Sequence, residues 1–222
     1  MKSNKKKRSG LLPGFAVLCI AAIFSFTLAG CDNGTDPGGG DGGDTITPDP
    51  PWTGTPVYSL GDTGPGGGKI FYVSQTGFTM TDNNTTAHYL EAAPADSGTK
   101  AWGTYGTDIS GTATALGTGR KNTALILADA NARAAKACKD LTTGGKTDWF
   151  LPSKDELNYL YTNRSYVGNL QTVEDTTNWT HIYWSSSQPS DNRHAMWQRF
   201  SNGYQGEEDK PELYSVRAVR AF

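Results

Sequence analysis

Residues 148–157 read Asp-Trp-Phe-Leu-Pro-Ser-Lys-Asp-Glu-Leu, and this stretch decides the fold. Ser153 followed three residues later by Glu156 is a capping box, which marks the start of a helix. Asp155 and Glu156 would then lie in the first turn, where the helix dipole favours negative charge. The apolar side chains that follow are spaced to form one face: Leu157, Leu160 and Tyr161. We predict a helix from Ser153, and because capping accounts for both acids, we expect no catalytic role for them.

A second helix is predicted before this stretch, over Thr123–Leu141. Its apolar stripe consists of residues that recur at helical spacing: Leu127, Ala130, Ala134, Cys138 and Leu141. Gly144 and Gly145 would end it. Cys138 is expected to be buried and unreactive, because a reactive thiol needs an electropositive, partly open setting.

Short strands are predicted on both sides of the helices. The glycine-rich turn at 61–68 leads into an apolar strand at 70–73, and a second early strand is expected at 89–93. The turn is no phosphate loop, because Thr63 and Ile70 stand where that motif needs Gly and Ser or Thr. Three late strands are predicted, at Ile182–Ser186, His194–Phe200 and Ser215–Phe222, with Gly203 and Gly206 in a hairpin turn. Two helices, short strands and long loops indicate an α+β fold.

The first 31 residues indicate export and lipid attachment. A basic head at 5–8 precedes an apolar run at 11–28, and Leu28-Ala29-Gly30-Cys31 follows the run. This pattern resembles a lipoprotein signal peptide, cleaved between Gly30 and Cys31, with Cys31 acylated and anchored in a lipid bilayer. A transmembrane helix is the alternative, but the run is short for a bilayer.

The rest of the chain divides into a tether and a body. Residues 31–56 are rich in Gly, Asp and Pro and are expected to be disordered, whereas 57–222 has the composition of one domain. Without residues 1–30, the chain has 15 basic and 22 acidic side chains, a formal charge of −7. No basic stripe is visible, so nucleic acid is not an expected partner.

Nothing in the sequence indicates catalysis, a metal or another cofactor. Ser185-Ser186-Ser187 lacks the flanking glycines of a nucleophile elbow. His88, His181 and His194 are scattered, and we identify no carboxylate or cysteine partner at a spacing that suits zinc. We therefore expect a protein that is not an enzyme.

Four stretches together resemble the Lcl C-terminal domain family, which is named after a bacterial collagen-like adhesin. They are 61–68, 149–157, Tyr183-Trp184-Ser185-Ser186-Ser187 and Val216-Arg217-Ala218-Val219-Arg220. The resemblance covers about residues 57–222 and implies a C-type lectin-like fold, with two helices packed on a small antiparallel sheet and long loops. The motif residues that it implies, with structural roles, are Trp149, Leu151, Pro152, Ser153, Glu156, Trp184, Ser185, Arg217 and Arg220.

Some properties of similar proteins do not carry over. Gly64-Pro65-Gly66 is a single triplet, so no collagen stalk is expected. The calcium-binding motifs of sugar-binding C-type lectins are absent. The distantly similar formylglycine-generating enzymes use two reactive cysteines, and the body has only Cys138.

The resemblance and the anchor together predict a surface lipoprotein that acts as a binding or adhesion module, with a polysaccharide or a host-matrix protein as ligand. The aromatic side chains expected to be exposed and to contact a ligand are Trp102, Trp179 and Trp197. The alternative is a structural or envelope-assembly lipoprotein that docks another protein. In both cases we expect the chain in the bacterial cell envelope, lipid-anchored at the outer membrane or cell surface.

Overall fold

The computed structural model describes Asp49 and residues 51–222, all of which belong to one compact unit. The predicted signal peptide, Cys31 and most of the predicted tether lie outside the described residues. Within the described part, no helix combines the length and the apolar character that a membrane span requires.

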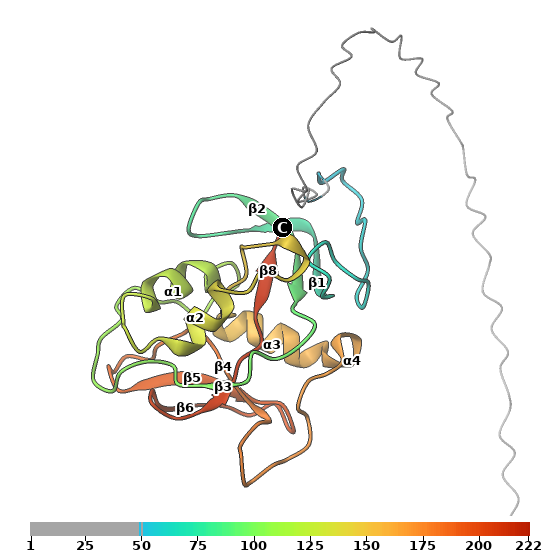
Figure 1. Cartoon of the computed structure of the whole chain (residues 1–222). Helices are drawn as coiled ribbons and strands as arrows, with labels where there is room; N and C mark the ends of the chain where they lie inside the picture. Colours follow the sequence, from blue (N-terminus) through green and yellow to red (C-terminus); the bar gives the residue numbers. More distant parts are fainter. Residues whose placement is uncertain (1–48, 50) are drawn as a thin grey trace, which may run out of the picture. The chain divides into compact units, whose positions relative to one another are not determined.

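The unit is built from two sheets, with helices beside and between them (Figure 1). The first sheet has the order β1-β2-β8 and is antiparallel. The second has the order β3-β7-β4-β5-β6, in which only the β4–β7 pair is parallel. The strands are β1 (Lys69–Thr79), β2 (Thr86–Ala92), β3 (Thr99–Lys100), β4 (Ile182–Trp184), β5 (His194–Arg199), β6 (Gln205–Asp209), β7 (Tyr214–Ser215) and β8 (Val219–Ala221).

Within the described residues, four α-helices accompany the sheets: α1 (Gly119–Ile126), α2 (Arg133–Lys139), α3 (Lys154–Thr162) and α4 (Arg164–Val167), with a 3₁₀ turn at Thr143–Gly145. Helix α3 contacts both β1 and β5, so it joins the two sheets. Its Leu157 and Leu160 are buried in the same cluster as Phe71 of β1 and Phe200 after β5. The predicted α+β class is confirmed.

The predicted capping box is also confirmed. The Ser153 hydroxyl accepts from the Glu156 backbone N–H at 3.3 Å, and the Glu156 carboxylate accepts from the Ser153 backbone N–H at 2.8 Å. Both side chains are fully buried. The helix start therefore lies in the interior, where its backbone donors need protein acceptors.

The single helix predicted over Thr123–Leu141 is wrong, because the chain turns between α1 and α2. The Asp129 carboxylate accepts from the backbone N–H groups of Thr104 and Asn131, which stabilises this turn. Leu127 and Ala130, assigned to the apolar stripe, are exposed as a result. Ala134 and Cys138 are buried as predicted.

The strand predicted over Ser215–Phe222 is also wrong, since this segment forms β7 in one sheet and β8 in the other. Arg217 lies between them and donates to the Asp96 carboxylate at 2.6 Å and to the Ala93 carbonyl at 2.8 Å. Strand β6 was not predicted, because Gln-Gly-Glu-Glu-Asp has low strand propensity. It lies at the edge of its sheet, where polar residues are common.

Candidate functional site on the β5–β6 hairpin

The motif residues implied by the resemblance lie in the interior. All nine are buried: Trp149, Leu151, Pro152, Ser153, Glu156, Trp184, Ser185, Arg217 and Arg220. Trp149 and Trp184 belong to one hydrophobic cluster with Trp102. These residues are therefore placed to hold the fold together, and a ligand would have to contact other side chains.

A buried ion pair holds the glycine-rich turn. The Glu91 carboxylate accepts from the backbone N–H groups of Gly66 and Gly68 at 3.0 and 2.7 Å, and from Arg220 at 3.2 Å. Arg220 also donates to Asp148 at 2.9 Å and to Asp49 at 2.6 Å. The Glu91 side chain is 0% exposed, and a buried charge needs hydrogen bonds and an ion pair to replace the water that it loses.

Asp49 and Trp52, which belong to the predicted tether, both contact the body. The indole of Trp52 stacks on the His88 imidazole, with ring centroids 3.7 Å apart and planes inclined by 5°. Asp49 also forms an ion pair with Lys146 at 2.9 Å. Contacts with the body therefore begin before residue 57, the predicted start of the domain.

The three tryptophans predicted as ligand contacts occupy different surroundings. Trp102 is 0% exposed, and its indole N–H donates to the Ser185 carbonyl at 2.7 Å. Trp197 is 8% exposed, whereas Trp179 is 41% exposed. The expectation of exposure is therefore wrong for Trp102 and Trp197 and is confirmed for Trp179. Packing explains the difference, because Trp102 and Trp197 lie in the cluster that also holds Trp184.

The reactive side chains considered in the sequence are engaged in structural contacts. The Ser185 hydroxyl donates to the Met196 carbonyl, and the Ser187 hydroxyl donates to the Ala113 carbonyl, both at 2.9 Å. Cys138 is fully buried, and burial raises the pKa of its thiol far above the usual value. The predicted burial of Cys138 is confirmed.

An open hollow lies against the β5–β6 hairpin, with a volume of about 540 Å³. We call its lining the hairpin surface: Lys154, Met196, Trp197, Tyr204, Gln205, Gly206 and Glu207. Tyr204 is 60% exposed, and its ring lies 5.7 Å from that of Trp197. A Cβ atom on Gly206 would lie 2.7 Å from the Trp197 indole, so glycine at this position lets the indole pack closely against β6. The hairpin surface thus combines aromatic rings with polar side chains.

A second hollow, of about 460 Å³, lies beside α1. Its aromatic lining residues, Trp149 and Phe150, are each 1% exposed. Its Arg120 is already paired with Asp82 at 2.7 Å. This hollow therefore presents no exposed aromatic ring to a ligand, whereas the hairpin surface presents Tyr204.

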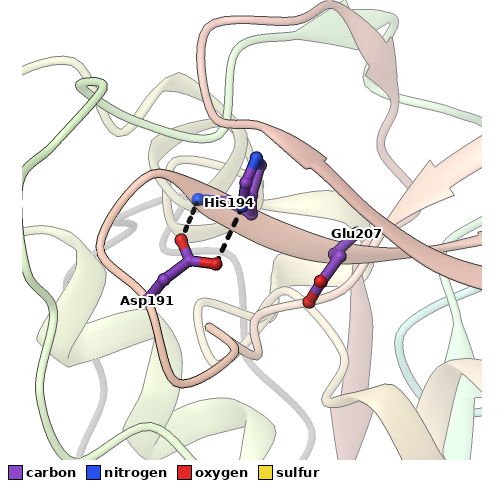
Figure 2. Close-up of side chains that lie close together, drawn as sticks. All are labelled: Asp191, His194 and Glu207. Carbon is purple, nitrogen blue, oxygen red and sulfur yellow. Dashed lines mark hydrogen bonds and ion pairs between the residues drawn. The ribbon is translucent and has the colours of Figure 1, made fainter.

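His194 lies near the hairpin surface, at the start of β5, and Figure 2 shows it hydrogen-bonded to Asp191, with Glu207 on the neighbouring strand. Its Nδ1 atom is 2.8 Å from Asp191 Oδ2, and its Nε2 atom is 3.1 Å from Asp209 Oδ1. The other Asp191 oxygen accepts from the backbone N–H groups of Arg193 and His194. The hydrogen bond that Asp191 accepts from the His194 ring raises the pKa of His194, and the same bond lowers the pKa of Asp191 to about 2.

Glu207 completes this group. One ligand atom from each of Asp191, His194 and Glu207 lies within 4.8 Å of the other two. Among Asp49 and residues 51–222, this is the one set of three or more His, Cys, Asp or Glu side chains that lie close enough to share a metal ion. We expected no carboxylate partner for His194 at a spacing that suits a metal, and that expectation is wrong. The spacing Asp191-x-x-His194 was available as a signal, but Glu207 could not be placed without the unpredicted strand β6.

The sequence model of the Lcl C-terminal domain matches residues 78–220. The chain belongs to the Lcl C-terminal domain family. Membership of this family suggests that the domain is a surface or adhesin-like module. It also suggests that the protein is located at the cell surface or in the envelope. No curated protein matches the chain.

The Lcl C-terminal domain match contains the whole β5–β6 hairpin, Asp191 and the buried arginines. It begins at Phe78, so the glycine-rich turn and most of β1 precede it. These parts nevertheless belong to the same fold, because the turn is hydrogen-bonded to Glu91 inside the matched range.

Proposed function

We propose that this Lcl C-terminal domain is a binding module that recognises a glycan through the hairpin surface. The exposed ring of Tyr204, beside Trp197 and above an open hollow, is the observation that carries the proposal. Aromatic faces pack against the apolar faces of sugar rings, and Tyr is enriched at binding interfaces.

The polar members of the hairpin surface support a neutral glycan over a sulfated one. Gln205 and Glu207 can hydrogen-bond to sugar hydroxyls, and Lys154 is the one cation in the lining. A polyanion would meet repulsion from Glu207 and from the neighbouring Asp191 and Asp209. The proposal includes no catalytic role.

A glycan array probed with the full chain in mild detergent tests this proposal. We expect retention on neutral glycans, and Tyr204→Ala is expected to weaken it about tenfold or more, as for an interface hot spot. Tyr166→Ala is the matched control, because Tyr166 is 50% exposed but lies in α4, outside the hairpin surface. A folded chain that binds no glycan, or a Tyr204→Ala chain that binds as well as the Tyr166→Ala chain, would contradict the proposal.

A docked protein is the competing function, and one observation favours it. Val173 is 81% exposed and Trp179 is 41% exposed, both in the segment before β4. A partner protein could bury these side chains, and Val173→Asp would then abolish its capture. If capture from envelope extracts depends on Val173 while glycan arrays stay negative, the docking function replaces the glycan proposal.

We also propose that acylated Cys31 anchors the domain to a membrane at the cell surface. The apolar run at 11–28 and Leu28-Ala29-Gly30-Cys31 support this. Cells grown with an alkyne-labelled fatty acid should label the chain, and Cys31→Ser should remove the label, whereas Cys19→Ser should keep it. Label retained in the Cys31→Ser chain would refute the anchor, and protease treatment of intact cells would test surface exposure.

A further inference from the structure

We propose that Asp191, His194 and Glu207 bind one divalent transition-metal ion, with Zn²⁺ as the representative. This inference does not depend on the glycan proposal. It rests on three groups that converge from two segments: the loop before β5 with the first residue of β5, and the middle of β6.

The size of the group fits such an ion. Zn²⁺ lies about 2.0–2.2 Å from imidazole nitrogen and carboxylate oxygen, so its ligand atoms are separated by roughly 3–4.5 Å. The three ligand atoms already lie within 4.8 Å of one another. Small side-chain rotations would therefore bring them to ligand distances.

The donor set selects the class of ion. One imidazole with two carboxylates suits Zn²⁺ and similar transition metals, whereas Ca²⁺ takes six to eight oxygen ligands. Asp209 adds a third carboxylate beside His194. This local negative charge favours a cation over an anion.

The surrounding contacts orient the imidazole. His194 carries a carboxylate on each ring nitrogen, Asp191 at Nδ1 and Asp209 at Nε2. An ion bound by Asp191 and Nδ1 would replace the proton at Nδ1, while Nε2–H continues to donate to Asp209. Metal-bound histidines usually donate their second N–H in this way, and Asp209 is therefore a positioning residue.

The ion would link the loop before β5 to β6. Strand β6 is at the edge of its sheet and pairs only with β5 among the described strands. Glu207 also belongs to the hairpin surface, so the ion would fix one side of that surface and would offset the negative charge that Asp191 and Glu207 present there without it.

Isothermal titration calorimetry with Zn²⁺ alone tests the proposal. The protein is the full chain in mild detergent, with Cys19 and Cys31 replaced by Ser so that their thiols do not bind the metal. We expect one saturable site, and a Co²⁺ absorption spectrum typical of nitrogen and oxygen ligands. Glu207→Gln and His194→Gln should each weaken Zn²⁺ binding at least tenfold, and Asp209→Asn by about 10–100-fold.

Two matched controls separate this site from adventitious binding. His88→Gln removes an imidazole in the other sheet, and Glu212→Gln removes an exposed carboxylate shortly after β6. Both should leave Zn²⁺ binding unchanged. Glu207 is exposed, so Glu207→Gln should keep the fold, as circular dichroism can verify. The absence of saturable binding, or equal binding by Glu207→Gln and Glu212→Gln, would overturn the proposal.

Discussion

The variant Glu156→Gln tests whether one buried carboxylate holds the start of α3 against the loop before α1. One Glu156 oxygen accepts from the Gly117 and Gly119 backbone N–H groups at 2.8 and 3.4 Å. The other oxygen accepts from the Ser153 backbone N–H at 2.8 Å. Gln has the same shape, but its amide nitrogen cannot accept a hydrogen bond.

The expected cost follows from this geometry. Glu156 is 0% exposed, so no bulk water replaces the missing acceptor. A buried N–H group without an acceptor costs about 1–3 kcal/mol. In a domain of this size, each kcal/mol lowers the melting temperature by roughly 2–4 °C.

Thermal unfolding followed by circular dichroism measures this effect. Asp155→Asn is the matched control, because Asp155 lies in the same helical turn but is only half-buried. Its loss of charge at the helix N-terminus should cost only about 0.3–1 kcal/mol. If Glu156→Gln lowers the melting temperature no more than Asp155→Asn does, the proposed role of Glu156 is refuted.

The pH dependence provides a second measurement on the same pair of variants. Burial raises the pKa of Glu156 from 4.5 to about 7, although the hydrogen bonds that Glu156 accepts from backbone N–H groups lower this pKa in part. The folded state therefore binds more protons than the unfolded state between pH 4.5 and 7, and this residue's contribution to stability falls as the pH rises through that range. Glu156→Gln should remove this fall, whereas Asp155→Asn should keep it.

Three further outcomes are expected. Urea unfolding should show a larger loss of stability for Gly68→Ala than for Gly67→Ala, because a Cβ on Gly68 would clash with the Ala92 carbonyl. Gly67 has open space around it but a φ of +77°, so Gly67→Ala should cost about 1–2 kcal/mol. Iodoacetamide should label Cys138 only after denaturation, because its thiol is buried, and peptide mass spectrometry would detect early labelling. NMR should give His194 a pKa above 6.5 in the folded protein. The contribution of its protonated ring to stability is then fully present below pH 6.5 and is lost as the pH rises through the folded-state pKa. A pKa at or below 6.5 would contradict the ion pairs.

Local signals in the sequence were sufficient for part of this fold. The capping box at Ser153 and Glu156 was predictable, because its two partners are three residues apart. The helix predicted over Thr123–Leu141 failed because Asp129 binds the backbone of Thr104, a contact between distant segments. Apolar periodicity cannot detect such a contact.

The candidate site was less predictable than the fold. Aromatic residues are visible in a sequence, but burial separates Trp102 at 0% exposure from Trp179 at 41% and Tyr204 at 60%. Tyr204 does not stand out in the sequence, because no local pattern distinguishes an exposed tyrosine in a hairpin from a core tyrosine.

The sequence by itself determined the start of α3, the glycine-rich turn into β1, the burial of Cys138 and the family resemblance. The first three depend on residues that are close along the chain, and the resemblance depends on short stretches that can each be read without the fold. Only the tertiary structure decided which rings are exposed and which carboxylates face His194. The reason is strand pairing, because β5 and β6 place Glu207 and Asp209 beside a histidine more than ten residues earlier. The hairpin surface and the proposed metal site both follow from that pairing.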